Sequence, residues 1–150
     1  MEKEDLDYLS NTLYNFYYLK RKEKKYNQDL IELDYKIETE KTYISANAYD
    51  IISSGCSVPS PHPTSVDYLV DKQLTIAMKI SEIQSKYASL DRENKITERI
   101  AKLSSESQLI INNVFERNLS ITYIATKVEN VSKQTISKRL DQALREMLKL

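Results

Sequence analysis

The stretch that decides the fold is residues 120–140, SITYIATKVENVSKQTISKRL. Its first half carries Ile121, Ile124, Ala125 and Val128. These apolar residues recur at steps of three and four, which predicts a short helix with one apolar face. Ser120 and, after a break in the pattern, Ser132 are suited to start helices, because a serine hydroxyl accepts a hydrogen bond from a first-turn amide. The stretch therefore predicts two helices joined by a tight turn, as in a helix-turn-helix.

Two short helices with narrow apolar faces need a third helix to cover them. The second helix continues the apolar stripe through Ile136, Leu140, Ala143, Leu144 and Met147, and Val131 is expected to plug the space between the two helices. Residues 105–115 supply the third helix. Ser105 and Gln108 have the spacing of a capping box. Its predicted apolar face consists of Leu109, Ile110, Val114 and Phe115.

The outward face of the last helix carries the functional prediction. If Ile136 and Leu140 point inward, the exposed polar residues are Lys133, Gln134, Ser137 and Lys138. Recognition helices read base edges chiefly through their first turns, so these four are the candidate base contacts. Lys127, Thr135, Arg139 and Arg145 are the candidate phosphate contacts. From residue 132 onward five basic residues stand against two acidic ones, a local excess in a chain of net charge zero that DNA would attract.

The residues before this motif predict a long antiparallel helical hairpin. Residues 6–52 place apolar residues at steps of three and four, Ile44, Ala48 and Ile51 among them, and predict the first helix. Thr64-Ser-Val-Asp67 has the form of a capping box and is expected to start the second helix, which is predicted to end between Leu90 and Ser104. The seam of the second helix is Leu69, Ile76, Ile80, Ile83, Tyr87 and Leu90, with Gln73 as its polar exception. Between the two helices residues 53–64 hold the only glycine and all three prolines, so they are expected to form a loop. The fold class is therefore all-α: a hairpin domain over residues 1–102, followed by a three-helix helix-turn-helix bundle over residues 103–150.

The role of the hairpin stays open between two readings. It folds on itself as an extension of the bundle, or the same seam pairs with a second copy, because two helices alone bury little apolar surface. The prediction is a homo-oligomer. The basic run at residues 20–25 covers most of a helix circumference, so it is either a solvated section or a further contact for phosphates or an acidic partner.

Composition argues against an enzyme. His62 is the only histidine, it lies between two prolines, and Cys56 is the only cysteine, so neither a metal site nor a cysteine–histidine pair is expected. A single glycine leaves no room for a glycine-rich phosphate loop. No cofactor is predicted. The charged N-terminus and the lack of a long apolar run predict a cytoplasmic protein without a membrane span.

Residues 109–148 resemble the fourth region of bacterial sigma factors, with an apolar helix, a Ser-led helix containing Ile-Ala, a Val-Ser turn and a helix ending in Ala-Leu-x-x-Met-Leu. In the order of its parts the whole chain resembles the ArpU/RinA-type late-gene regulators of phages and prophages. The step from Ala125 to Ser132 is one residue longer than in that pattern, and Glu129-Asn130 occupies the turn. Asparagine tolerates a left-handed conformation, so the turn is expected to form at Asn130.

This resemblance implies an activator of late genes that binds double-stranded DNA, with a hairpin that pairs subunits or touches RNA polymerase. The alternative reading is a coiled-coil interaction module that binds host RNA polymerase or another protein without touching DNA.

Overall fold

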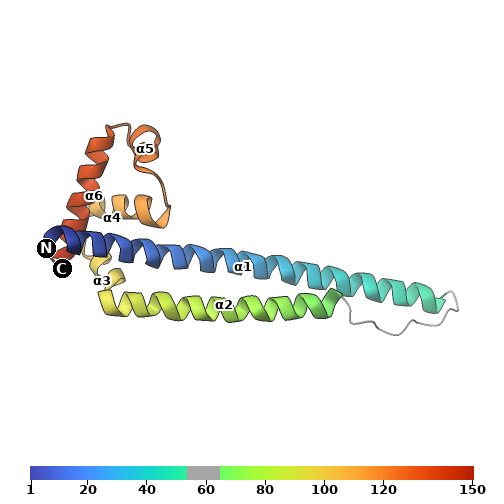
Figure 1. The fold of residues 1–150 in the computed structure, drawn as a ribbon. Helices are drawn as coiled ribbons and strands as arrows, with labels where there is room; N and C mark the ends of the chain where they lie inside the picture. The colour runs from blue at the N-terminus through green and yellow to red at the C-terminus, as the bar shows by residue number, and fades with distance from the viewer. Residues whose placement is uncertain (54–64) are drawn as a thin grey trace. The chain divides into compact units, whose positions relative to one another are not determined.

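The computed structural model describes the backbone of residues 1–53 and 65–150 and the side chains of residues 1–42 and 66–150. Within these ranges the chain is helical and has no strand, which confirms the predicted all-α fold. The elements are α1 (Glu2–Ser53), α2 (Ser65–Asn94), α3 (Ile96–Ala101), α4 (Ser105–Ile111), η1 (Asn112–Glu116), α5 (Ile121–Tyr123), η2 (Ile124–Val128) and α6 (Lys133–Leu148), where η marks a π-helical turn (Figure 1).

The contacts divide the chain into two compact units. The bundle unit contains residues 1–22 and 84–150, and the hairpin unit contains residues 23–83. The bundle unit therefore includes the start of α1 and the end of α2 together with the helix-turn-helix. The sequence instead predicted a boundary between residues 102 and 103, which separates a hairpin for association from a bundle for DNA binding. These two roles stay predictions.

The hairpin unit packs α1 against α2 in antiparallel directions. Lys79 lies over the ring of Tyr26, with Nζ 5.9 Å from the ring centroid, and Gln73 donates a hydrogen bond to Asp34. The later residue of α1, Asp34, therefore contacts the earlier residue of α2, Gln73, which is the order expected for antiparallel helices. The seam holds Leu33, Ile76 and Ile80, with Tyr26, Leu30 and Leu69 packed at its edges. Gln73 is the polar exception that the sequence indicated.

The bundle unit has a larger core because several elements meet in it. Its buried residues include Leu13 and Phe16 of α1, Ile96 of α3, Ile111 of α4, Ile124 and Ala125 of η2, and Ile136, Ala143 and Met147 of α6. Val131 packs against this core as the predicted plug. Figure 1 shows α6 beginning near α5 and ending beside the first turns of α1, where Arg145 pairs with Glu2.

Two predicted core residues are exposed instead. Leu109 is 51% exposed, because the buried face of α4 runs through Ser107, Ile110 and Ile111. Val128 is 41% exposed. It ends the π-helical turn η2, and a π-helical turn advances fewer degrees per residue than an α-helix, so Val128 rotates off the apolar face.

The start of α4 also differs from the prediction by one residue. Its N-cap is Ser104, not Ser105, and the Ser104 Oγ accepts a hydrogen bond from the Ser107 amide at 3.3 Å. Gln108 does not close a capping box. The side-chain amide of Gln108 instead donates a hydrogen bond to the Leu103 carbonyl at 3.1 Å, so it stabilises the residues just before the helix.

The helix α2 stops within the range that the sequence predicted, between Leu90 and Ser104. The helix ends at Asn94 because Lys95 adopts a left-handed conformation with φ 51°. The carboxylate of Asp91 spans the break, accepting from the Thr97 amide at 2.8 Å and from the Thr97 hydroxyl at 2.9 Å. The short helix α3 follows at once and places Ile96 in the core.

Several sequence predictions lie outside the described residues. They concern residues 54–64 of the predicted loop, with Cys56 and His62, the start of the second helix at Thr64, and the side chains of Ile44, Ala48 and Ile51. In residues 1–53 and 65–150 no helix is both long enough and apolar enough to cross a membrane.

Candidate nucleic-acid interface

The first turn of α6 is fixed by its cap. Ser132 has an extended backbone, and its Oγ accepts a hydrogen bond from the Thr135 amide at 3.2 Å, as predicted. The hydroxyls of Ser132 and Thr135 lie 2.8 Å apart. Thr135 is half-buried and engaged in this cap, so its side chain shapes the helix start. Free amides and the helix dipole give such a start a partial positive charge.

The four candidate base contacts lie together on the exposed side of α6. Lys133 and Ser137 are one turn apart, as are Gln134 and Lys138, and all four side chains are exposed. The apolar stripe beside them is buried: Ile136, Ala143 and Met147 have no exposed surface. Packing of the apolar stripe therefore leaves these polar side chains free to approach a groove of DNA. This is the geometry that direct readout requires.

The turn before α6 absorbs the extra residue that the sequence showed. In η2 the Glu129 amide bonds to the Ile124 carbonyl at 2.9 Å, one residue farther back than in an α-helix. Asn130 then adopts φ 51°, as expected, and the Val131 amide returns to the Ala125 carbonyl at 2.8 Å. The wider turn takes up one residue, so α5 and α6 stay separate helices.

The end of the preceding helix repeats this geometry. The Arg117 amide bonds to the Asn112 carbonyl at 2.8 Å, Asn118 adopts φ 53°, and the Leu119 amide bonds to the Asn113 carbonyl at 3.0 Å. Both helix ends thus use a π-helical turn followed by a left-handed asparagine. The sequence signal is an asparagine one residue before an apolar residue and two before a capping serine, in Asn118-Leu-Ser120 and Asn130-Val-Ser132.

Arg139 is held by two acidic side chains of the same unit. Its Nε lies 3.6 Å from Glu106 of α4, and its Nη1 lies 3.6 Å from Glu129 of the turn. The Arg139 side chain is only 34% exposed. The guanidinium links α4, the turn and α6, so a phosphate would have to compete with both carboxylates for it.

Arg145 is paired in the same way near the end of α6. Its Nε lies 2.7 Å from Asp141, and it also contacts Glu2 at the start of α1. The hydrogen bond that Arg145 donates to Asp141 and the charges of both carboxylates raise the pKa of Arg145 above its usual value. Among the candidate phosphate contacts Lys127 differs from the two arginines, because its side chain is exposed on η2.

Two residues that position the helix-turn-helix were not predicted. Glu146 of α6 accepts hydrogen bonds from the Ser104 amide at 3.0 Å and from the Ser107 hydroxyl at 2.7 Å. These bonds lower the pKa of the Glu146 carboxyl. Arg21 of α1 donates to the backbone carbonyls of Phe115 and Glu116, the latter at 3.3 Å. Arg21 belongs to the basic run, yet it stabilises the end of η1.

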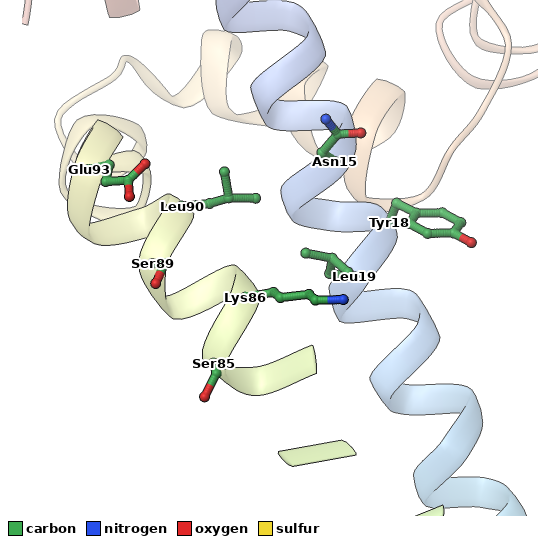
Figure 2. A pocket seen from close by; sticks show the side chains of 8 residues that line it. All are labelled: Asn15, Tyr18, Leu19, Ser85, Lys86, Ser89, Leu90 and Glu93. Carbon is green, nitrogen blue, oxygen red and sulfur yellow. The ribbon is translucent and has the colours of Figure 1, made fainter. Parts of the chain in front are cut away.

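A shallow groove lies between α1 and α2 within the bundle unit. It has a volume of about 630 Å³ and is lined by Asn15, Tyr18, Leu19, Ser85, Lys86, Ser89, Leu90 and Glu93. Figure 2 shows Leu19 and Leu90 directed into the space between the helices, with Lys86 reaching across from α2. Just beside the groove the exposed rings of Tyr14 and Tyr18 stack with their centroids 6.4 Å apart.

Comparisons with protein-family models, with curated protein sequences and with solved structures find no match for this chain. Within the described residues no three histidine, cysteine, aspartate or glutamate side chains are grouped as a metal site. The candidate interface therefore depends on its own geometry and on the resemblance noted in the sequence.

Proposed function

We propose that this protein is a sequence-specific DNA-binding transcription regulator. The observation that carries the proposal is the polarity of α6: Lys133, Gln134, Ser137 and Lys138 are exposed on its first two turns, while Ile136, Ala143 and Met147 of the same helix fill the core. A helix presented in this way, capped at its start and preceded by a short helix and a tight turn, is suited to enter the major groove.

The roles of the individual residues follow from their chemistry. The Gln134 amide would pair with an adenine edge, and Lys133 and Lys138 would contact guanine or phosphate. Lys127 would neutralise a phosphate, and the hydroxyl of Thr135 would lie near the backbone of the DNA. Arg139 and Arg145 would reach phosphates only by exchanging the carboxylates that now hold them.

The wider biological setting comes from the sequence resemblance. We propose a regulator, in the class of phage and prophage late-gene activators, that acts in the cytoplasm of a bacterial host, associates with further copies of itself and contacts RNA polymerase. The chain needs no cofactor for this role.

The test is a charge reversal on the exposed side of α6. A duplex is first selected by the parent protein from a random-sequence library, and its binding is then measured by gel shift. The double variant Lys133→Glu/Lys138→Glu should weaken binding at least about 100-fold, because two attractive contacts with a polyanion become repulsive. Far-ultraviolet circular dichroism should remain that of the parent.

The matched control carries the same change of charge on exposed lysines of other helices, Lys3→Glu/Lys72→Glu. This control should bind the selected duplex within about threefold of the parent, which is under 1 kcal/mol of binding free energy. Equal loss of binding in both double variants, or selection that enriches no duplex, would contradict the proposal.

The groove in Figure 2 favours a second candidate function, an interaction module that binds host RNA polymerase without contacting DNA. Its apolar floor and mixed rim are typical of a protein contact. The variant Ser89→Tyr, which fills the groove, should then abolish binding to purified bacterial RNA polymerase and leave helix content unchanged. Full polymerase binding by Ser89→Tyr would exclude this use of the groove.

A further inference from the structure

The helix α2 carries two apolar seams within the hairpin unit. The first seam contains Leu69, Gln73, Ile76, Ile80 and Ile83, and it faces α1. The second seam contains Val70, Leu74, Ala77 and Ser81, each one residue after a member of the first. One residue rotates a helix by about 100°, so the second seam faces a direction nearly at right angles to the first.

The second seam is exposed. Val70 is 44% exposed and Leu74 is 62% exposed, and Ala77 and Ser81 are exposed as well. Met78 extends the same surface and is 67% exposed. None of these side chains carries a charge. A helix with two heptad-spaced seams about 90° to 100° apart has the pattern of a corner helix in a four-helix arrangement, where each helix has two neighbours.

We infer that the second seam of α2 pairs with the same seam of a second copy, in the antiparallel direction. Its residues are self-complementary in that direction alone. When Leu74 faces Ala77 of the second copy, Val70 faces Ser81 in the same register, so every layer joins one large and one small side chain. A parallel pair would instead stack Leu74 on Leu74 and Ala77 on Ala77, giving layers of unequal width.

The hairpin unit also gives a reason for such a partner. Its own seam buries few described side chains, and an isolated pair of helices is marginally stable. Each large side chain of the second seam leaves on the order of 100 Å² of apolar surface to be covered. The three large side chains, Val70, Leu74 and Met78, together expose less than the ~800 Å² per partner of a standard interface, so the association should depend visibly on protein concentration.

This inference specifies how two copies of the proposed regulator would associate. It is tested without DNA, so its failure would leave the DNA-binding proposal standing. Sedimentation equilibrium of the full chain over a concentration series should show the 17.5 kDa chain converting to a dimer. Leu74→Glu should raise the dimer dissociation constant at least about tenfold, because it places a charge against Ala77 of the second copy. Thr75→Glu introduces the same charge one residue away on the exposed surface and should leave the dissociation constant unchanged.

Cysteine cross-linking tests the direction of the pair. In a Cys56→Ser background, Val70→Cys mixed with Ser81→Cys should yield a disulfide-linked heterodimer on oxidation. Val70→Cys alone should not cross-link, because the two copies of residue 70 would lie eleven residues apart along the helices, about 16 Å, beyond the reach of a disulfide. A monomeric parent, a dimer that survives Leu74→Glu, or efficient cross-linking of Val70→Cys to itself would overturn the inference.

Discussion

The bundle unit and the hairpin unit differ in how many neighbouring helices cover the apolar side of each helix. In the bundle unit α1, α3, α4, η2 and α6 all contribute side chains to one core, and Leu13, Ile111, Ile124 and Ile136 have no exposed surface. In the hairpin unit two helices share a seam whose buried cluster, Leu33, Ile76 and Ile80, keeps 4% to 8% of its surface exposed.

The difference shows where a partner is needed. A helix surrounded by several neighbours places its polar residues on the one side left open, and in α6 that side is the candidate DNA interface. A helix with one neighbour leaves apolar residues exposed, as α2 does at Leu74 and Met78. The bundle unit should therefore be stable by itself, whereas the hairpin unit should gain stability from association.

The largest effect should come from shortening the same side chain in each unit. Ile136→Ala removes a fully buried side chain from a core enclosed on all sides and should cost about 3 to 4 kcal/mol of the free energy of unfolding. Ile80→Ala, in a seam that is open at its edges and can close around the loss, should cost roughly 1 to 2 kcal/mol.

Urea unfolding followed by far-ultraviolet circular dichroism measures both losses. It should also be run on Ser137→Ala, an exposed substitution on α6 that is expected to change stability by less than about 0.5 kcal/mol. Equal costs for Ile136→Ala and Ile80→Ala would mean that the two units are packed equally well, and the comparison would fail.

A second prediction concerns alkaline pH and Tyr17 of the bundle unit. Tyr17 is buried, 7% exposed, against Phe16, and burial together with the charges of Glu116 and Asp91 raises its pKa from 10.0 to about 12. The unfolded chain releases the phenol proton first, so stability should fall as pH rises from about 10 to about 12, by on the order of 2 kcal/mol.

Tyr17→Phe should remove that part of the alkaline loss, as measured by urea midpoints at a series of pH values. Tyr35→Phe is the control, because Tyr35 of the hairpin unit is 75% exposed. The same substitution there removes an exposed phenol and not a buried one. An alkaline loss that persists in Tyr17→Phe would show that the Tyr17 phenol is not its source.

Apolar spacing was sufficient to predict the helices and most of their buried faces. The steps of three and four through Ile76, Ile80 and Ile83 located the hairpin seam, and the serines at 120 and 132 located two helix starts. Leu109 was assigned to the core within the regular helix α4 and is exposed, and two further features were missed where the backbone leaves the α-helical repeat. Val128 was assigned to the core because a periodicity of 3.6 cannot anticipate a π-helical turn, and Lys95 gave no sign of a left-handed residue.

In the candidate site, too, the exposure of side chains could be predicted from the sequence, whereas their ion pairs could not. Exposure of Lys133, Gln134 and Lys138 could be predicted from the apolar stripe of α6. The ion pairs of Arg139 could not, because Glu106 lies on another helix and Glu129 in a turn, and only the folded structure brings them within 3.6 Å. Sequence alone identifies a basic residue but not the acid beside it.

Arg139 offers a smaller and more discriminating test within the bundle unit. Arg139→Gln should lower stability by no more than about 1 kcal/mol, since its ion pairs are partly exposed. If Arg139 positions α6 without touching DNA, the variant should weaken DNA binding while the slope of log K against log salt stays that of the parent. A lost phosphate contact would instead reduce that slope by about 0.9. Lys127→Gln, at an exposed lysine, is the comparison expected to reduce it.

The smallest effect should come from the left-handed residues, all three of which lie in the bundle unit among the described parts of the chain. Lys95 has φ 51°, a conformation that glycine adopts without a steric penalty. Lys95→Gly should therefore remove that penalty but also increase the entropy of the unfolded chain. The net effect should be a stabilisation of about 0.5 kcal/mol. Lys102→Gly is the matched control: its φ is −88°, so glycine there relieves no strain, adds the entropic cost and removes the 2.9 Å ion pair with Glu98, and it should destabilise the protein by about 0.5 to 1 kcal/mol. Opposite shifts of the two urea midpoints are therefore expected, and a shift of the same sign would mean that the break at Lys95 is not the strained end of α2 inferred here.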